Sequence, residues 1–310
     1  MTTNIFTCMG QKAVVTGGAG FIGSHIVDAL LERGDEVHVV DDLSAGKREY
    51  VNPKASFYKL DIRDREALIS ACAGADHIFH VAALPRVQFS IENPLETHEV
   101  NVTGTLNVLY AAAENRVKKV VFSSSSSVYG DQDTMPLVET MSANPKSPYA
   151  LHKYIGERYC SVWSEVFSVP TVSLRYFNVY GPRQTADGSY PLVTARFLKQ
   201  REEGEKLTIT GDGEQTRDFT HVRDVVRANL LAADSEAVGR GEAINIGAGS
   251  NISINRIAEL VGGEVEHIEP RFEPRHTLAD NSKAGTLLGW EPTVSIEEGM
   301  AELKRMQGVT

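Results

Sequence analysis

Cysteine is scarce in this chain, and its few cysteines form no pattern. Cys8, Cys72 and Cys160 are odd in number and widely separated. This argues against a disulfide framework and a cysteine-based metal site, and it favours a reducing compartment. No apolar run reaches the length of a transmembrane helix, and the N-terminus lacks the charged-then-apolar pattern of a secretory signal. We therefore expect a cytoplasmic protein that binds no metal and no membrane.

Positive charge is also in short supply. Lys and Arg number 31 against 41 Asp and Glu, which gives a formal net charge of −10. This balance argues against nucleic acid as a partner, and a small anionic ligand would need specific arginines. Aromatic residues make up only 7% of the chain, but 42% hydrophobic and 23% charged residues are ordinary for a globular protein. The 310 residues suffice for one large or two modest domains.

What the chain does have is a glycine-rich turn near its start. Residues 13–15 are the apolar Ala-Val-Val, residues 16–23 read TGGAGFIG, and apolar residues recur at helical spacing over 22–33. This order predicts a strand, a tight turn and a helix. Such glycines permit the turn, the approach of a pyrophosphate and close packing of helix on strand. The stretch indicates a dinucleotide site, and a purely structural glycine turn is the alternative.

A second predicted strand, residues 37–41, ends in Asp41 at about the distance that a ribose-binding carboxylate requires. A carboxylate there accepts hydrogen bonds from a ribose 2′-hydroxyl and repels a 2′-phosphate, so it favours NAD over NADP. Lys47 and Arg48 follow closely and could receive that phosphate. We interpret them instead as a solvated turn.

Four further strands are predicted at residues 56–61, 76–81, 118–122 and 171–177, and helices between them at 63–72, 95–115 and 149–167. Six strands that alternate with helices indicate an α/β fold with a doubly wound parallel (Rossmann) sheet. Later, less regular elements suggest a smaller C-terminal α/β lobe, with strands at 207–210 and 243–246 and helices near 196–203, 221–233 and 254–261. We expect residues 1–177 to bind NAD and residues 178–310 mainly to bind substrate, with later segments returning to the first domain.

Several polar or small residues follow the predicted strands. Asp61 is either an adenine contact or the N-cap of the next helix. His80 is more typical of a packed core histidine than of a catalyst. Ala82 and Ala83 are small enough for a cofactor to lie close. Asn101 would hold a backbone group or water near the nicotinamide, unless it is an ordinary exposed polar residue.

The strongest candidates for chemistry follow the fifth strand. Residues 123–127 are five serines at a strand end, where open α/β sheets bind ligands, although a serine run is more often a linker. Tyr149 and Lys153 are four apart, so they share one helix face. An ammonium beside a phenol favours the phenolate, which would be a general base. Alone, such a pair is more often core plus surface; after the glycine turn and the serines, we interpret it as catalytic.

Taken together, these motifs resemble the extended short-chain dehydrogenase/reductase family, and within it the nucleotide-sugar epimerases related to UDP-galactose 4-epimerase. The resemblance covers nearly the whole chain and rests on residues 16–25, Asp41, 123–130, 147–153, 175–181, 211–213 and 217–219. It implies NAD as cofactor and a UDP-sugar as substrate, whose C4 is inverted through a transient 4-keto sugar. It also implies a homodimer joined by the helices at 95–115 and 149–167.

The resemblance assigns roles residue by residue. Ser125 corresponds to the hydroxyl that hydrogen-bonds the sugar O4, Tyr149 to the proton acceptor and Lys153 to its pKa partner. With the motifs above, the expected cofactor contacts are Gly17, Gly20, Phe21, Ile22, Gly23, Asp41, Asp42, Ser44, Gly46, Asp61, Ile62, Ala82, Ala83, Asn101, Ser123, Tyr149, Lys153 and Phe177. The expected substrate contacts are Ser125, Ser126, Ser127, Tyr149, Asn178, Thr208, Arg217, Arg275 and Thr277. Each of the two arginines, taken alone, is more typical of a surface ion pair.

The resemblance also bears on the reaction and the sugar. Related 4,6-dehydratases and decarboxylases carry acids where this chain has Ser126 and Ser127, so epimerisation is favoured. Thr277 is small where a bulky tyrosine goes with plain hexoses, which suggests that UDP-GlcNAc/UDP-GalNAc is accepted alongside UDP-Glc/UDP-Gal. The loop at 271–275 is one residue shorter than in the family and lacks its glycine. The alternatives are a UDP-glucuronate 4-epimerase, another nucleotide-sugar dehydratase or reductase, and a non-catalytic NAD-binding regulator.

Overall fold

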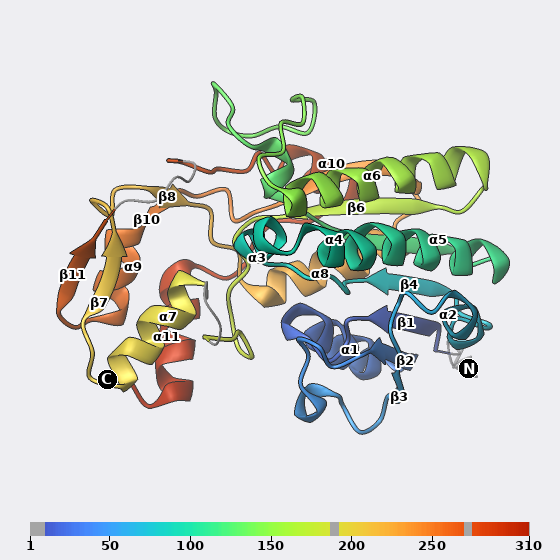
Figure 1. Cartoon of the computed structure of the whole chain (residues 1–310), viewed down its shortest axis with the longest axis horizontal. Helices are drawn as coiled ribbons and strands as arrows, with labels where there is room; N and C mark the ends of the chain where they lie inside the picture. Colours follow the sequence, from blue (N-terminus) through green and yellow to red (C-terminus); the bar gives the residue numbers. More distant parts are fainter. Residues whose placement is uncertain (1–9, 187–191, 270–274, 310) are drawn as a thin grey trace, which may run out of the picture.

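A wholly parallel seven-stranded sheet is the centre of the computed structural model, which describes residues 10–186, 192–269 and 275–309 (Figure 1). The strand order is β3-β2-β1-β4-β5-β6-β9. Its strands are β1 (Lys12–Thr16), β2 (Glu36–Asp41), β3 (Ser56–Lys59), β4 (His77–His80), β5 (Lys119–Ser125), β6 (Thr171–Tyr176) and β9 (Arg240–Ile246). The order reverses direction between β1 and β4, and doubly wound sheets bind ligands at the carboxyl ends of the strands beside such a point. The expected fold class is confirmed.

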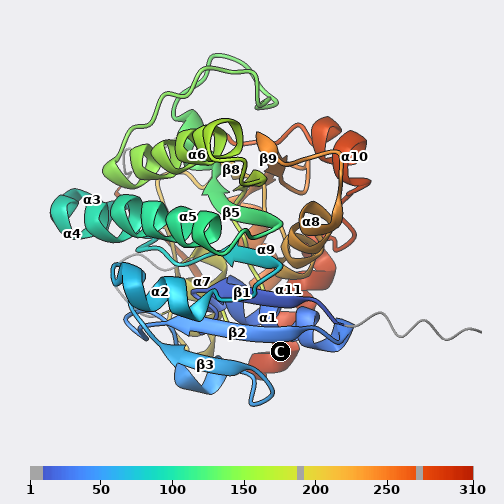
Figure 2. The same cartoon turned by 90° about the vertical axis from the view of Figure 1, so that its right-hand side faces the viewer.

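Helices cover both faces of this sheet (Figure 2). On one face lie α1 (Phe21–Arg33) and α8 (Val222–Asp234); on the other lie α2 (Arg65–Ala71), α5 (Thr105–Glu114) and α6 (Pro148–Val166). Because side chains alternate along a strand, Val15 and Val39 are buried in the core under α1, while Val14 and Val40 are buried in the core under α2 and α5.

The helix expected at 95–115 is interrupted. It consists of α4 (Pro94–His98), a π-helical turn η2 (Glu99–Gly104) and α5, and the short α3 (Val87–Glu92) precedes it. Wide π turns are often found at functional sites. Here the turn contains Asn101, one of the expected cofactor contacts.

The serine run is not a linker. Strand β5 extends through Ser125, and residues 126–129 form a 3-10 turn, η3 (Ser126–Tyr129). Ser123 and Ser124 are buried within the sheet layer. The hydroxyls therefore occupy fixed positions at the carboxyl edge of the sheet.

A smaller lobe lies beside the sheet, at the left of Figure 1. It contains the parallel pair β7 (Leu207–Thr210) and β11 (Val265–Ile268), the antiparallel pair β8 (Thr216–Arg217) and β10 (Ile252–Ser253), and the helices α7 (Val193–Glu202), α9 (Ile254–Val261) and α11 (Ile296–Gln307). Phe197, Ile257 and Met300 belong to its separate core. The shortened loop noted above falls largely on residues 270–274, which are outside the described residues.

Two elements assigned above to the smaller lobe belong to the main sheet instead. β9 pairs in parallel with β6, and α8 packs against α1, β5 and β6. α10 (Ser282–Leu288) then packs on α8 and β9. The chain thus crosses back after entering the lobe, and the periodicity of these short elements could not reveal which layer they join.

Candidate active site

The three motif glycines after β1 serve different purposes. Gly17 has φ +72°, and a Cβ there would lie 2.7 Å from the backbone nitrogen of Ala82. A Cβ at Gly23 would lie 2.1 Å from the carbonyl oxygen of Gly17. At Gly20 a Cβ would meet only that same carbonyl, at 3.2 Å, and otherwise open space. Two glycines thus pack backbone against backbone, and the third leaves room for a ligand.

That room lies at the start of α1. The first turn of α1, which begins with Phe21 and Ile22, has no capping side chain at Gly20 and no acidic residue. Its N-terminal N–H groups and the positive end of the helix dipole therefore suit an anion such as a pyrophosphate.

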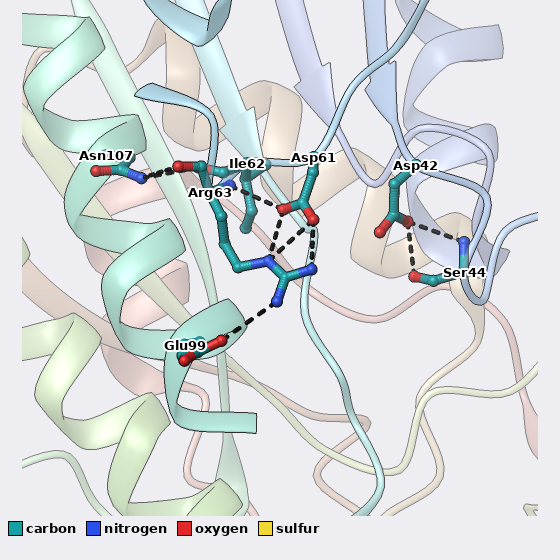
Figure 3. Close-up of polar contacts among 7 residues, drawn as sticks. All are labelled: Asp42, Ser44, Asp61, Ile62, Arg63, Glu99 and Asn107. Carbon is teal, nitrogen blue, oxygen red and sulfur yellow. Dashed lines mark hydrogen bonds and ion pairs between the residues drawn. The ribbon is translucent and has the colours of Figure 1, made fainter. Parts of the chain in front are cut away.

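Asp41 organises the loop that follows β2. Its carboxylate accepts hydrogen bonds from the backbone N–H of Ala19 (2.9 Å) and of Leu43 (2.8 Å), and a Cβ at Gly46 would lie 2.8 Å from it. Burial raises the pKa of Asp41, and these N–H donors oppose that shift. Each oxygen keeps a lone pair that a ribose hydroxyl could use. In the same loop, Asp42 accepts from both the N–H and the hydroxyl of Ser44 (Figure 3).

Asp61 is held by its neighbour Arg63, which donates to it from Nε and Nη2, the latter at 2.6 Å (Figure 3). This side-chain hydrogen bond lowers the pKa of the carboxyl group. The N-cap of α2 is Asp64, which accepts from the N–H of Ala67, so the N-cap interpretation of Asp61 is wrong. A side chain three residues before the cap cannot reach the same N–H groups. Ile62 is buried, and its carbonyl accepts from the Asn107 side chain.

Asn101 holds the loop that follows β4 through two hydrogen bonds. Its side chain accepts from the N–H of Leu84 (2.8 Å) and donates to the carbonyl of Leu84 (3.1 Å), and only 3% of the residue is exposed. It therefore holds a backbone segment, and the interpretation as an exposed polar residue is wrong. This loop includes Ala82 and Ala83, and the backbone of Ala82 packs against Gly17.

His80 is a buried structural histidine. Its two ring nitrogens lie within hydrogen-bond distance of the Thr16 and Thr105 hydroxyls, and burial lowers its pKa to about 3. The imidazole is therefore neutral near pH 7, as expected for a core residue.

These residues fit a dinucleotide. The space beside Gly20, the uncapped N-terminus of α1 and the carboxylate of Asp41 occur in the order that a pyrophosphate and its adenosine ribose require. Lys47 and Arg48 are exposed and lie over the rings of Tyr50 and Phe57, in keeping with a solvated turn.

Ser125, Tyr149 and Lys153 come together beside this site. Tyr149 lies next to the Ser125 side chain, which acts to lower its pKa, and the Lys153 ammonium lies 5.9 Å from the centroid of the Tyr149 ring. The same ammonium donates a 2.7 Å hydrogen bond to the carbonyl of Ser123. Helix α6 begins immediately before Tyr149, where Ser147 caps it and Pro148 occupies its first position.

The electrostatics of the pair are set by burial. Burial raises the pKa of Tyr149 to about 12, which the hydrogen bond to Ser125 partly opposes. Burial lowers the pKa of Lys153 to about 8. The phenol is therefore protonated near pH 7 unless positive charge lies beside it. Lys153 is the side chain at hand to provide that charge.

The remaining serines differ in environment. The Ser123 hydroxyl lies 3.1 Å from the Tyr176 hydroxyl, so it is turned toward the neighbouring strand β6. Ser126 and Ser127 are half-buried in η3. The Ser127 hydroxyl has no hydrogen-bond partner in the part of the chain that the structure describes.

Four expected substrate contacts meet where β8 lies beside residues 275–277. The Arg217 guanidinium donates to the carbonyl of Arg275, and Thr277 lies within 3.5 Å of the Asn178 amide nitrogen. Asp218 links this cluster to the main sheet, because its carboxylate accepts from three backbone N–H groups, those of Ala248, Gly249 and Ala279. Arg275 also forms an exposed ion pair with Asp212, as its surface interpretation predicted.

Two expected contacts lie elsewhere. Thr208 is within the smaller lobe, where its hydroxyl is bonded to Gln200 of α7, and no described contact joins it to the cluster above. Phe177 is fully buried beside Tyr129. No group of three or more His, Cys, Asp or Glu suited to a metal occurs among the described residues, and no described helix is long and apolar enough to cross a membrane.

Sequence reasoning missed a buried ion pair under this site. Glu157 and Arg175 are about 5% exposed and are joined by two hydrogen bonds, of 2.8 and 2.7 Å. The spacing of Tyr149, Lys153 and Glu157, each four residues after the last, was the available signal.

The sheet order, with an uncapped glycine turn at its reversal point, defines a Rossmann-type dinucleotide-binding protein. Residues 13–247 match the NAD dependent epimerase/dehydratase family. The chain therefore belongs to this family. NAD, expected from Asp41, is confirmed as the cofactor.

Individual relatives span most of the chain. UDP-glucose 4-epimerase of Mycolicibacterium smegmatis is 38% identical over 306 residues, covering 94% of this chain and 97% of the relative. The structure of UDP-glucose 4-epimerase from Thermotoga maritima with UDP-glucose has a TM-score of 0.90 at 39% identity, covering 96% and 99%. UDP-N-acetylglucosamine 4-epimerase from Methanobrevibacter ruminantium, in complex with UDP-N-acetylmuramic acid, has a TM-score of 0.90 at 36% identity, with the same coverage. These relatives differ in the sugar that they are named for.

Proposed function

We propose that the protein is an NAD-dependent UDP-hexose 4-epimerase. The observation that carries the proposal is that the Tyr149 and Ser125 side chains meet at the end of β5, with the Lys153 ammonium 5.9 Å from the centroid of the Tyr149 ring. A proton acceptor and a hydroxyl donor that meet at one point suit a single sugar hydroxyl, and they lie at the edge of a sheet that belongs to an NAD-dependent family.

In this proposal the residues act on the 4-hydroxyl. Ser125 hydrogen-bonds O4, and Tyr149, as phenolate, takes the O4 proton and later returns it. Lys153 favours the phenolate through its positive charge. NAD, when bound, accepts hydride from C4 and returns it, so that no external redox partner is consumed. Arg217 and Arg275, which are neighbours, would hold the diphosphate while the sugar turns.

The sugar proposed is a neutral hexose, with or without an N-acetyl group. Support comes from Ser126 and Ser127, which carry no acid for elimination or decarboxylation, and from the small Thr277 beside Asn178. Relatives are named for glucose, for N-acetylglucosamine and for glucuronic acid, so the choice proposed here rests on the residues of this chain.

The test is incubation of purified protein with UDP-glucose, UDP-GlcNAc and UDP-glucuronate in separate tubes, with the C4 epimers measured by NMR and no NADPH added. Epimers of the first two support the proposal. Turnover of UDP-glucuronate alone would indicate a glucuronate epimerase, and a product formed only with NADPH would indicate a reductase. No turnover of any sugar by protein with NAD bound would favour a regulator.

We also propose a homodimer formed through α4 and α6. Both helices expose apolar side chains, among them Leu95 (81% exposed) and Leu151 (44%). Changing either to Glu should convert the dimer to a monomer in light scattering. Met306→Glu, on an exposed position of α11, is the control and should change nothing. A wild-type monomer would contradict the proposal.

A further inference from the structure

The ion pair under the active site sits on the same helix face as the proposed catalytic residues. Tyr149, Lys153 and Glu157 are spaced four residues apart on α6, so their side chains project along one stripe. Each one contacts a different serine of β5: Tyr149 the Ser125 side chain, Lys153 the Ser123 carbonyl, and Glu157 the Ser124 hydroxyl at 2.5 Å. Three successive strand residues thus lie against three successive turns of the helix, and two of the contacts are hydrogen bonds.

The Glu157 carboxylate is fixed from two strands. One oxygen accepts from both Ser124 and Arg175 Nε (2.8 Å), and the other from Arg175 Nη2 (2.7 Å). Ser124 and Arg175 are register partners in β5 and β6. The guanidinium in turn lies 4.6 Å above the centroid of the Tyr129 ring. The carboxylate therefore has one defined position beneath Lys153.

Stability alone is a poor explanation for this arrangement. Removing two charges from water is costly, and a buried pair often stabilises a fold no more than apolar residues of similar size. A buried charge does, however, act strongly on other charges near it, because little water screens it. The nearest functional charge on the stripe is Lys153.

The groups that face Lys153 come from α6, β4 and β6, and most of them are neutral near pH 7. Burial lowers the pKa of His80 to about 3 and that of His152 to about 4, and it raises the pKa of Cys160 and of Tyr149 to about 12. The exceptions are Glu157 and Arg175, which are charged and form an ion pair with each other. Burial lowers the pKa of Lys153, and Cys160 and Glu157 oppose this. Since the thiol is neutral, Glu157 supplies the negative charge.

We propose that Glu157, held by Arg175 and Ser124, is a positioning residue that keeps Lys153 protonated and fixes it against the end of β5. It touches neither substrate nor cofactor. Its catalytic consequence rests on the proposed function: a protonated Lys153 is what favours the Tyr149 phenolate. The charge coupling itself is independent of any reaction.

The experiment is an NMR titration of Lys153 in the full-length protein, with lysine labelled at 13Cε and the resonance assigned by its absence in Lys153→Met. Glu157→Gln should move the midpoint down by about one pH unit or more, because an adjacent carboxylate is lost. Glu157→Asp should restore most of the shift. Arg175→Gln should also move the midpoint down, because it removes the side chain that holds the carboxylate and leaves a buried, unpaired acid that favours its neutral form.

A purely structural role predicts another outcome. Loss of packing would admit water around Lys153 and move its midpoint up in both variants, or would leave it unchanged, and either result would overturn the proposal. Asp35→Asn, which breaks a partly buried ion pair with Arg33 far from α6, is the control and should leave the midpoint unchanged. Should Glu157→Gln fail to fold, the downward shift in Arg175→Gln decides alone.

Kinetics supply the second readout. In Glu157→Gln, the alkaline limb of the pH profile of kcat should move to lower pH together with the Lys153 midpoint, rather than kcat falling by one factor at every pH. A shifted midpoint in a protein without epimerase activity would contradict the proposed function only. An active wild type whose Lys153 midpoint ignores Glu157 would contradict this inference only.

Discussion

Asn101 binds both backbone groups of Leu84, at 2.8 and 3.1 Å, from within a π-helical turn. The loop that it holds carries Ala82, which lies against Gly17 of the glycine turn. One buried amide therefore holds the loop after β4 against η2, in the segment that also packs on the glycine turn.

Asn101→Ala should weaken NAD binding and lower stability. The change leaves the N–H and carbonyl of Leu84 without their partner, at a cost of about 1–3 kcal/mol for each buried group. Isothermal calorimetry with NAD and thermal unfolding measure the two effects. Asn115→Ala is a matched control, because Asn115 bonds the carbonyls of Ile69 and Ala111 away from the site. It should cost stability without changing the NAD affinity.

Two alanine substitutions in the glycine turn should separate folding from binding. Gly17→Ala meets the Ala82 backbone at 2.7 Å with φ +72°, so the protein should be strongly destabilised. Gly20→Ala meets only one carbonyl at 3.2 Å, so the fold should persist while NAD affinity falls about tenfold or more. Circular dichroism and NAD titration distinguish the two. Equal loss of fold in both variants would refute the assignment of separate roles.

Tyr149→Phe should lower kcat by about 10²–10⁴ while NAD affinity stays near wild type. The phenol is the proposed base, and its removal leaves the glycine turn and Asp41 intact. Turnover is measured with a saturating UDP-sugar. Activity close to wild type would show that another group accepts the proton.

Asp218 should make stability depend on pH. Burial raises its pKa to about 6, which the three N–H donors oppose. The folded state then binds the proton more tightly than the unfolded chain, so this group's contribution is present below about pH 4 and is lost as the pH rises through 6. The free energy of unfolding of wild type minus that of Asp218→Asn should therefore shrink by about 2 kcal/mol from pH 4 to pH 7.5. Urea denaturation across that range measures it, and a constant difference would contradict it.

Thr277→Tyr should abolish turnover of UDP-GlcNAc and spare that of UDP-glucose. Thr277 lies beside Asn178 and the backbone of Asp218, so a tyrosine there would fill the space next to the proposed sugar site. Thr277→Ser is the control and should keep both activities. Undiminished N-acetyl turnover in Thr277→Tyr would show that another residue sets the size of the pocket.

The predictable parts of the fold were those with strong local patterns. The glycine turn, Asp41 and the Tyr149–Lys153 spacing lie within single strand–turn–helix units, so the sequence indicated them directly. The capping box of α11, Ser295 with Glu298, was also a readable signal, although no helix was predicted there. The layer that β9 joins could not be predicted, since it depends on pairing with β6 across a long excursion of the chain. The Glu157–Arg175 pair was likewise hidden, because its partners come from separate elements.

The most direct test of the account is NMR of UDP-glucose that carries deuterium at C4, incubated with the wild-type protein in ordinary water. If the O4 proton passes to Tyr149 and hydride leaves and returns at C4, UDP-galactose should form with deuterium still on C4. Loss of deuterium to solvent, or no C4 epimer from either UDP-glucose or UDP-GlcNAc, would contradict it.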